Sequence, residues 1–198
     1  MTSRISKRAW LIITVTSIIA VGALTGSIPC CSYPNPSNST LTSTASNQTP
    51  ASNETTASEK TLDFTLPALT GANVTLSELK GTPVVLNFWS TCCPYCRQQM
   101  PYLEDVGQQS GGEIKVIAIS IYDSASGIQD FFGNHKPSIT IALDSKQKTF
   151  LEYCSAYENA LDSIPFTLFI DSEGIVRYAK IGAFASEAEL WDTIHSVF

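Results

Sequence analysis

The sequence has no excess of basic residues. Its 198 residues include 12 Lys and Arg against 18 Asp and Glu, which gives a formal net charge of −6 at pH 7. A protein that binds nucleic acid through the phosphate backbone needs a basic patch or stripe. The sequence lacks this footprint, so we expect no nucleic acid partner.

The sequence also lacks a second close pair of cysteines. A structural zinc site needs four ligands, which usually come as two close pairs. Cys93 and Cys96 form one Cys-x-x-Cys pair, but only Cys154, His135 and His195 follow it as typical zinc ligands. A structural zinc site is therefore disfavoured, and we expect no metal and no other cofactor.

Charged residues are absent from residues 9–29, a stretch about as long as a bilayer-spanning helix. Arg4, Lys7 and Arg8 precede it. Basic residues before an apolar run predict a cytoplasmic N-terminus and delivery of the rest of the chain to the outer side. We therefore interpret residues 1–31 as a membrane anchor or signal segment.

Three kinds of processing are compatible with this segment: an uncleaved anchor, a cleaved signal peptide and a lipoprotein signal ending at Cys30 or Cys31. The preceding residues match a lipoprotein cleavage box poorly, because Pro29 comes directly before Cys30. No clear small-x-small site precedes a soluble start either. An uncleaved anchor is favoured, with a lipid anchor as the next alternative.

Residues 32–60 are rich in Ser, Thr, Asn, Pro and Ala, with few apolar side chains. Such a composition buries too little surface to offset the entropy of ordering the chain. We expect a flexible linker that tethers a folded domain, residues 61–198, to the membrane.

One stretch of this domain carries a recognisable chemical pattern. Residues 84–89 form an apolar run typical of a strand buried on both faces, and a helical pattern starts at about Pro94. Cys93 would then lie at a helix N-terminus, with Cys96 one turn further in. Unpaired N–H groups and the positive end of the helix dipole stabilise a thiolate there. The pair predicts a redox dithiol that exchanges disulfides. An inert structural disulfide is the alternative, which a proline inside the loop disfavours.

The order of strand-like and helical patterns predicts an α/β sheet covered by helices on both faces. Strands are expected at residues 62–66, 84–89, 114–121, 139–143, 166–170 and 175–181, and helices at residues 94–109, 124–135, 146–157 and 187–197. The last two strands form a hairpin, and a helix closes the chain.

The segment Asn87-Phe88-Trp89-Ser90-Thr91-Cys92-Cys93, together with Cys96-Arg97 and Met100-Pro101, resembles the active site of TlpA/ResA-type thioredoxin-like proteins of the AhpC/TSA–redoxin superfamily. Asp63-Phe64-Thr65-Leu66-Pro67 and Ile164-Pro165-Phe166-Thr167 extend the resemblance over residues 62–198. It implies a thioredoxin fold with a central mixed sheet and a strand–helix insertion between residues 114 and 157.

The resemblance also implies roles for individual residues. Cys93 would attack a substrate disulfide, and the more buried Cys96 would resolve the mixed disulfide. A cis Pro165 would face the dithiol and leave the backbone of Ile164 free to pair with an extended substrate. Trp89 would pack beside the site. The loop residues Pro94 and Tyr95 would tune the pair and touch a partner.

Two positions depart from related proteins. Gln99 stands where the family often has a glutamate implicated in proton handling, and a glutamine cannot ionise. Asn87 stands where thioredoxin itself has a buried acid, although this change agrees with the TlpA/ResA-type family. No obvious carboxylate is left to deprotonate Cys96, although Glu104 or a water is a candidate.

Two further cysteines have open roles. Cys92 stands where the family commonly has Trp; it is either a packing residue, the favoured interpretation, or a third reactive thiol. For Cys154 we expect a buried bystander, and pairing with another cysteine is the alternative.

By resemblance, the function is that of an exported, membrane-tethered thiol–disulfide oxidoreductase in the bacterial cell envelope. It would reduce disulfides in exported proteins, such as apocytochromes c, and would be recharged by a membrane electron donor of the DsbD/CcdA type.

Two other functions compete. A Sco-like copper-binding module would use Cys92 and Cys96, since thiolates suit Cu(I), but it needs a distant histidine, for which His135 is a weak candidate. A peroxiredoxin-like peroxidase lacks support because the Pro-x-x-x-Thr-x-x-Cys loop is not present.

Overall fold

The computed structural model describes residues 60–198. The expected anchor, residues 1–31, and all of the expected linker except Lys60 lie outside the described residues. Within residues 60–198, no helix has both the length and the apolar character needed to cross a membrane.

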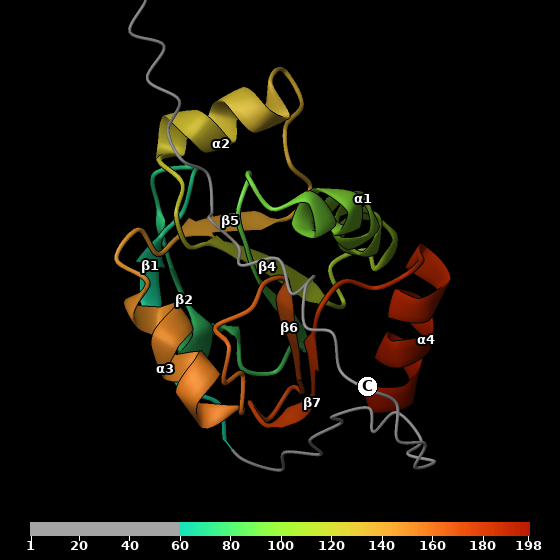
Figure 1. Ribbon diagram of the computed structural model, residues 1–198. Coiled ribbons are helices and arrows are strands. Elements are labelled where there is room, and N and C mark those ends of the chain that lie inside the picture. The colour runs from blue at the N-terminus through green and yellow to red at the C-terminus, as the bar shows by residue number, and fades with distance from the viewer. Residues whose placement is uncertain (1–59) are drawn as a thin grey trace, which may run out of the picture. The chain divides into compact units, whose positions relative to one another are not determined.

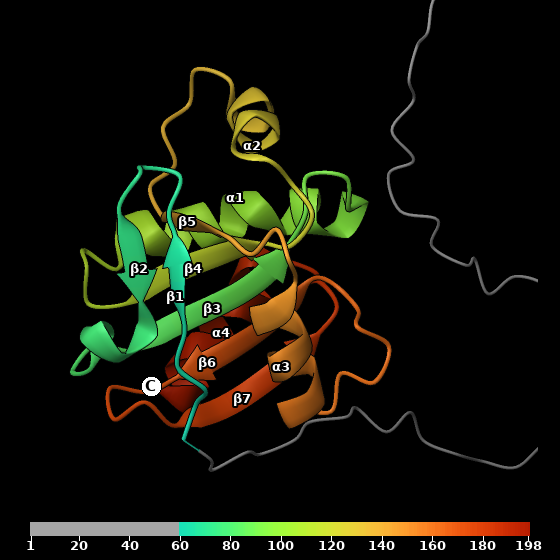
Figure 2. The same cartoon turned by 90° about the vertical axis from the view of Figure 1, so that its left-hand side faces the viewer.

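The centre of the described domain is a mixed five-stranded sheet. Its strand order is β5 (Thr140–Leu143), β4 (Lys115–Ser120), β3 (Val84–Trp89), β6 (Phe166–Ile170) and β7 (Val176–Ile181). The β3–β4 and β4–β5 pairs are parallel, whereas β3–β6 and β6–β7 are antiparallel. Figure 2 shows these strands side by side. The predicted mixed sheet is confirmed.

A small hairpin precedes the sheet. Strands β1 (Thr65–Pro67) and β2 (Asn73–Thr75) pair antiparallel, and the 3-10 helix η1 (Leu76–Leu79) follows. The hairpin joins the edge of the sheet at β5, where the amide of Leu69 donates to the carbonyl of Ile141 at 2.8 Å.

Helices cover both faces of the sheet, as predicted (Figure 1). The α/β class and the thioredoxin fold with its strand–helix insertion are confirmed. The four helices are α1 (Pro94–Gln109), α2 (Ala125–Phe132), α3 (Lys148–Ala156) and α4 (Glu187–Val197). Side chains of α1, α2 and α4 pack on one face, and those of α3 and the β1–β2 hairpin pack on the other.

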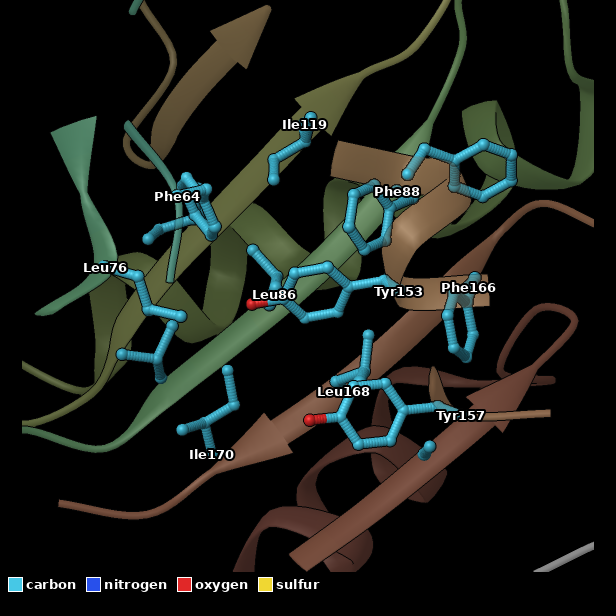
Figure 3. Packing of buried hydrophobic residues seen from close by; sticks show 14 of the residues in the cluster. Phe64, Leu76, Leu86, Phe88, Ile119, Tyr153, Tyr157, Phe166, Leu168 and Ile170 are labelled. Atoms are coloured by element: carbon cyan, nitrogen blue, oxygen red, sulfur yellow. The ribbon is translucent and has the colours of Figure 1, made fainter. Parts of the chain in front are cut away.

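The alternation of side chains along β3 creates these two separate cores. Leu86 and Phe88 join the core under α3, whereas Val85 and Trp89 join the core under α1. Figure 3 shows the first core, in which the ring of Phe88 packs against Tyr153 of α3 and Phe166 of β6. Full burial of one such side chain contributes about 1.5–3 kcal/mol, so both faces stabilise the strand that leads to the cysteines.

Two helices differ in length from the prediction. The α2 helix ends at Phe132, earlier than the expected residue 135, because Gly133 adopts a positive φ of 58° that ends the helix. The α3 helix starts at Lys148, later than the expected residue 146, because Gln147 is left-handed (φ 58°). The carboxylate of Asp144 accepts a hydrogen bond from the Phe150 amide at 2.8 Å and so fixes this start.

Candidate active site

The loop between β3 and α1 places the two cysteines. Cys93 is the N-cap of α1, and Pro94 follows at the first helical position, where its missing N–H leaves no bond unmade. The Cys96 amide donates a hydrogen bond to Cys93 Sγ at 3.2 Å. The thiol of Cys93 therefore takes the place of a capping side-chain oxygen.

The surroundings of Cys93 favour its thiolate. Hydrogen bonds from the Cys96 thiol, and then from the backbone N–H groups of Cys96 and Tyr95, lower the pKa of Cys93 to about 7, against the opposing effect of burial. Near neutral pH a large share of this thiol is therefore ionised, which makes it a ready nucleophile.

The surroundings of Cys96 have the opposite effect. Its side chain is 2% exposed. Burial, followed by the hydrogen bond to Cys93 and repulsion from the Cys93 charge, raises the pKa of Cys96 well above its usual range. The structure thus describes a reduced pair in which one thiol is poised to react and the other holds its proton.

A second segment faces the pair from across the domain. The Ile164–Pro165 peptide bond is cis, as predicted, and the Cys93 thiol lies 3.8 Å from the Ile164 carbonyl oxygen. A surface groove begins here and is lined by Tyr95, Gln98, Ser163, Ile164, Pro165, Ile181, Gly182, Ala183, Phe184 and Ala185. Tyr95, at 67% exposed, stands on its rim.

The structure thus brings together six of the seven predicted site residues, namely Cys93, Pro94, Tyr95, Cys96, Ile164 and Pro165. The seventh, Trp89, lies beneath them. Its ring is fully buried in the core shared with Cys93 and Cys96. It packs against Phe131 and Phe132 of α2, with ring centroids 5.4 and 6.1 Å away. Trp89 therefore supports the site from below and offers no surface to a partner.

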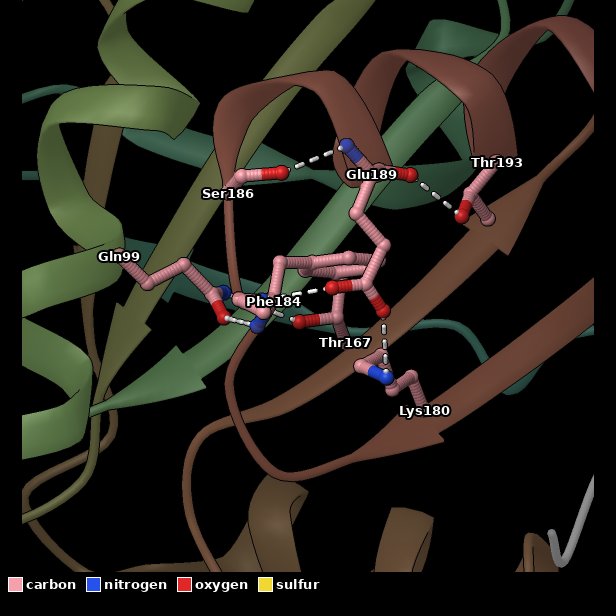
Figure 4. A network of polar contacts seen from close by, with 8 residues as sticks. Gln99, Thr167, Lys180, Phe184, Ser186, Glu189 and Thr193 are labelled. Atoms are coloured by element: carbon pink, nitrogen blue, oxygen red, sulfur yellow. Dashed lines mark hydrogen bonds and ion pairs between the residues drawn. The ribbon is translucent and has the colours of Figure 1, made fainter.

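Gln99, which departs from the family, and Asn87, which departs only from thioredoxin itself, meet in one buried polar network. Gln99 donates to Thr167 Oγ1 at 3.3 Å and accepts from the Phe184 amide at 3.0 Å (Figure 4). Asn87 donates to the same Thr167 hydroxyl oxygen at 2.9 Å. Gln99 therefore connects α1 to β6 and to the groove wall at Phe184.

The candidate base Glu104 is occupied elsewhere. Its carboxylate lies 2.9 Å from His135 Nε2 and accepts a hydrogen bond from the Ser138 amide at 3.2 Å. It also follows Cys96 by eight residues, roughly 12 Å along the helix axis. Glu104 therefore fixes the segment before β5 and does not face the thiols.

Sequence reasoning missed Asp123, which follows β4 and touches the active-site loop. Its carboxylate accepts hydrogen bonds from the Thr91 amide at 2.9 Å and from the Ser120 hydroxyl at 2.6 Å. The sequence did contain a signal for Asp123. The carboxyl ends of neighbouring parallel strands meet at one edge of a sheet, and functional sites form at that edge. Strand β3 ends at the cysteine loop, and Asp123 comes just after its parallel neighbour β4.

The two other described cysteines have different surroundings. Cys92 is half-buried, and its Sγ lies 3.2 Å from the Ser90 hydroxyl oxygen. Cys154 is buried in the core under α3, across the sheet from Cys93 and Cys96. Burial raises the pKa of Cys154 to about 12. The sheet thus separates Cys154 from the redox pair, which agrees with the expected bystander.

A copper site would need ligands beyond Cys92 and Cys96. Among residues 60–198, no three His, Cys, Asp or Glu side chains gather as they would around a metal ion. The weak candidate His135 is held by Glu104.

Comparison with known proteins shows the family of this chain. Residues 57–179 match the AhpC/TSA family. The chain belongs to this family. It is 30% identical to the thioredoxin-like protein YneN of Bacillus subtilis, over 61% of this chain and 68% of YneN. It is 29% identical to the thiol–disulfide oxidoreductase ResA of Halalkalibacterium halodurans, over 65% of this chain and 70% of ResA.

A solved structure gives the same result for the fold. A Chlorobium tepidum protein assigned as the thiol:disulfide interchange protein DsbE superimposes with a TM-score of 0.61 and 26% identity. The match covers 71% of this chain and 96% of that protein. The predicted TlpA/ResA resemblance and the predicted enzyme class, a thiol–disulfide oxidoreductase, are confirmed. The cysteine pair of such an enzyme carries the redox chemistry without a further cofactor.

Proposed function

We propose that this chain is an exported, membrane-tethered oxidoreductase that reduces disulfides in exported proteins through Cys93 and Cys96. The observation that carries the proposal is the asymmetry of the pair. Cys93 has a pKa of about 7 at a helix N-terminus beside a groove, and Cys96 is buried with a raised pKa. An attacking thiol works best when its pKa lies near the ambient pH.

The reaction has two steps. The Cys93 thiolate attacks one sulfur of a substrate disulfide, forms a mixed disulfide and releases the first substrate thiolate, which takes up a proton. Cys96 then loses its proton and attacks Cys93 Sγ, which releases the second substrate thiolate and leaves a Cys93–Cys96 disulfide. Two electrons pass from the protein to the substrate.

Formation of the mixed disulfide removes two of the causes that hold the proton on Cys96. The Cys93 charge and the hydrogen bond between the thiols both raise the pKa of Cys96 in the reduced form. A mixed disulfide carries no charge on Cys93, so the pKa of Cys96 falls at the stage at which it must attack.

The groove beside Cys93 suits an extended polypeptide. Pairing of β6 with β3 starts at Phe166, so Ile164 lies just beyond the ladder. Its carbonyl oxygen is 3.8 Å from Cys93 Sγ, which suits a substrate backbone that pairs there while its cysteine meets the thiolate. Tyr95 and Pro94 would contact the same partner from the other rim.

The cellular setting is part of the proposal. Residues 1–31 would serve as the anchor or signal segment, and residues 32–60 as the tether. The tether would keep the domain at high effective concentration near membrane partners in the bacterial cell envelope. Those partners would include an electron donor of the DsbD/CcdA type, and apocytochromes c are one substrate class.

The reduction potential of the pair tests the direction of electron flow. Purified full-length protein would be equilibrated with a thiol buffer, and the Cys93–Cys96 peptides quantified by alkylation and mass spectrometry. A potential near that of thioredoxin, about −270 mV, supports a reductase. A value near that of DsbA, about −120 mV, would make the protein a disulfide donor and contradict the proposal. The C93S variant is the control, because it cannot form the pair.

A further inference from the structure

The carboxylate of Asp123 makes contacts that converge on the active-site loop. The amide and the hydroxyl of Thr91 both donate hydrogen bonds to it, and the Ser90 hydroxyl lies 3.5 Å from it. The Ser120 hydroxyl, at the end of β4, donates to it at 2.6 Å and ties it to the sheet. Bonds to an ionised carboxylate are stronger than bonds between neutral groups.

Of the residues that Asp123 contacts, Ser90 is the one that also contacts the thiols. The Ser90 hydroxyl oxygen lies 3.2 Å from Cys92 Sγ. The Ser90 backbone N–H is directed at the Cys96 thiol, and the Ser90 carbonyl accepts the Cys93 amide at 3.2 Å, closing the turn. A shift of Ser90 would therefore move both members of the redox pair relative to each other.

We propose that Asp123 is the positioning residue of the active-site turn, which it holds through Ser90 and Thr91 so that Cys96 is aligned to attack Cys93. The assignment rests on the proposed roles of the two cysteines. A misplacement of about 1 Å at reacting atoms can lower a rate by as much as 100-fold. The resolving step is the one most exposed to this loss, because it needs both sulfurs aligned.

Asp171 provides a matched structural control. Its carboxylate accepts hydrogen bonds from the amides of Glu173 and Ile175 and from Arg177 Nε, so it also organises a turn with several bonds. This turn follows β6 beside Val84, at the start of β3, and so lies at the end of the sheet opposite to the cysteine loop. Loss of Asp171 should affect stability without moving the thiols.

The test measures the resolving step directly. Glutathione disulfide is added to the reduced full-length protein, and the Cys93–glutathione mixed disulfide is followed by acid quench and peptide mass spectrometry. The rate at which it closes to the Cys93–Cys96 disulfide, with release of glutathione, is compared among variants at one pH. Thermal unfolding of each variant is recorded in parallel.

We expect D123A to slow closure at least tenfold, whereas D171A stays within about twofold of the unmodified protein although it unfolds at a lower temperature. D123N should recover part of the loss, because its remaining oxygen still accepts from Thr91 Oγ1. S90A and T91V each remove one hydroxyl contact and should slow closure by smaller factors. If D123A does not fold, the closure rates of S90A and T91V test the proposal instead.

Closure at an unchanged rate in D123A, S90A and T91V would overturn the assignment. Equal slowing in D171A and D123A would overturn it too, because the effect would then follow stability. The readout is independent of the proposed function. A protein that closes the disulfide but reduces no protein disulfide would refute that function and still report on Asp123.

Discussion

The backbone amide of Cys96 points at Cys93 Sγ across 3.2 Å. One hydrogen bond thus serves both structure and chemistry: it caps α1 and stabilises the negative form of the nucleophile. Four ordinary features produce it, namely a buried strand, a short loop, a proline at the first helical position and a cysteine at the N-cap. The reactivity of Cys93 therefore follows first from the Cys96 thiol beside it and then from the way the helix begins.

The first prediction concerns the ionisation of Cys93. Thiolate absorbance near 240 nm, corrected by subtracting the C93S variant, should titrate with a midpoint at about pH 7. C96A should move the midpoint upward, because the Cys96 thiol is the largest cause of the lowered pKa. A midpoint near 9 in the unmodified protein would contradict the described geometry.

The lowered pKa of Cys93 also predicts how the stability of the reduced protein depends on pH. The folded-state pKa of Cys93, about 7, lies below the ordinary value of 9.0. Its contribution is therefore fully present above pH 9 and is lost as the pH falls through 7. Urea unfolding of the reduced protein should show this gain between pH 7 and 9, and C93S should lack it.

The second prediction concerns Gln99, where this chain departs from the family. Q99L leaves the Phe184 amide, which donates to Gln99 Oε1, without its partner and removes a donor to Thr167. An unsatisfied buried group costs about 1–3 kcal/mol, so urea unfolding should show a loss of that size. The Michaelis constant for a peptide disulfide should also rise, because Phe184 lines the groove.

Gln108 offers a control for this change, since it is an exposed glutamine on the same helix. Q108L should alter the free energy of unfolding by less than about 0.5 kcal/mol and leave the Michaelis constant unchanged. If Q99L and Q108L behave alike, the buried network does not have the structural role assigned to it.

The third prediction concerns Gly107, which lies inside α1 where alanine is the better helix former by about 1 kcal/mol. A Cβ at this position would lie 2.5 Å from Ile139 Cγ2, and the β-branched Ile139 has little freedom to turn away. G107A should therefore destabilise the protein by about 1–3 kcal/mol.

G127A is the matched change in α2, because the nearest atom to its Cβ would be Ser124 Oγ at an acceptable 3.4 Å. It should be neutral or stabilising by up to about 1 kcal/mol. Thermal or urea unfolding of G107A and G127A measures both predicted changes in stability. A gain in stability for G107A would mean that α1 and the segment before β5 pack less closely than described.

Much of the fold was predictable from local patterns. The apolar run of β3 and the capping serines of α2 and α4 are signals contained in a few consecutive residues. Helix ends were less predictable, because the left-handed conformations of Gln147 and Gly133 depend on how the chain turns back to the sheet.

Cys93 and Cys96 were predictable for the same reason, because their spacing and their flanking residues lie in one short segment. Asp123 and the Gln99 network were not predictable in this way. Thr91 and Asp123 are 32 residues apart, and Gln99 and Phe184 are 85 apart. Such contacts exist only once parallel strands and a returning loop have been brought together. Gln99 looked in the sequence like the loss of an ionisable group, but in the structure it is a connection between three elements.

Trapping of the mixed disulfide tests directly whether Cys93 is the attacking thiol and Cys96 the resolving one. The C96S variant would be incubated with a disulfide-bonded protein substrate, and the covalent adduct mapped by mass spectrometry. We expect a stable adduct on Cys93, with C92S/C96S giving the same adduct and C93S/C96S giving none. An adduct on Cys92, or no adduct on any cysteine, would contradict it.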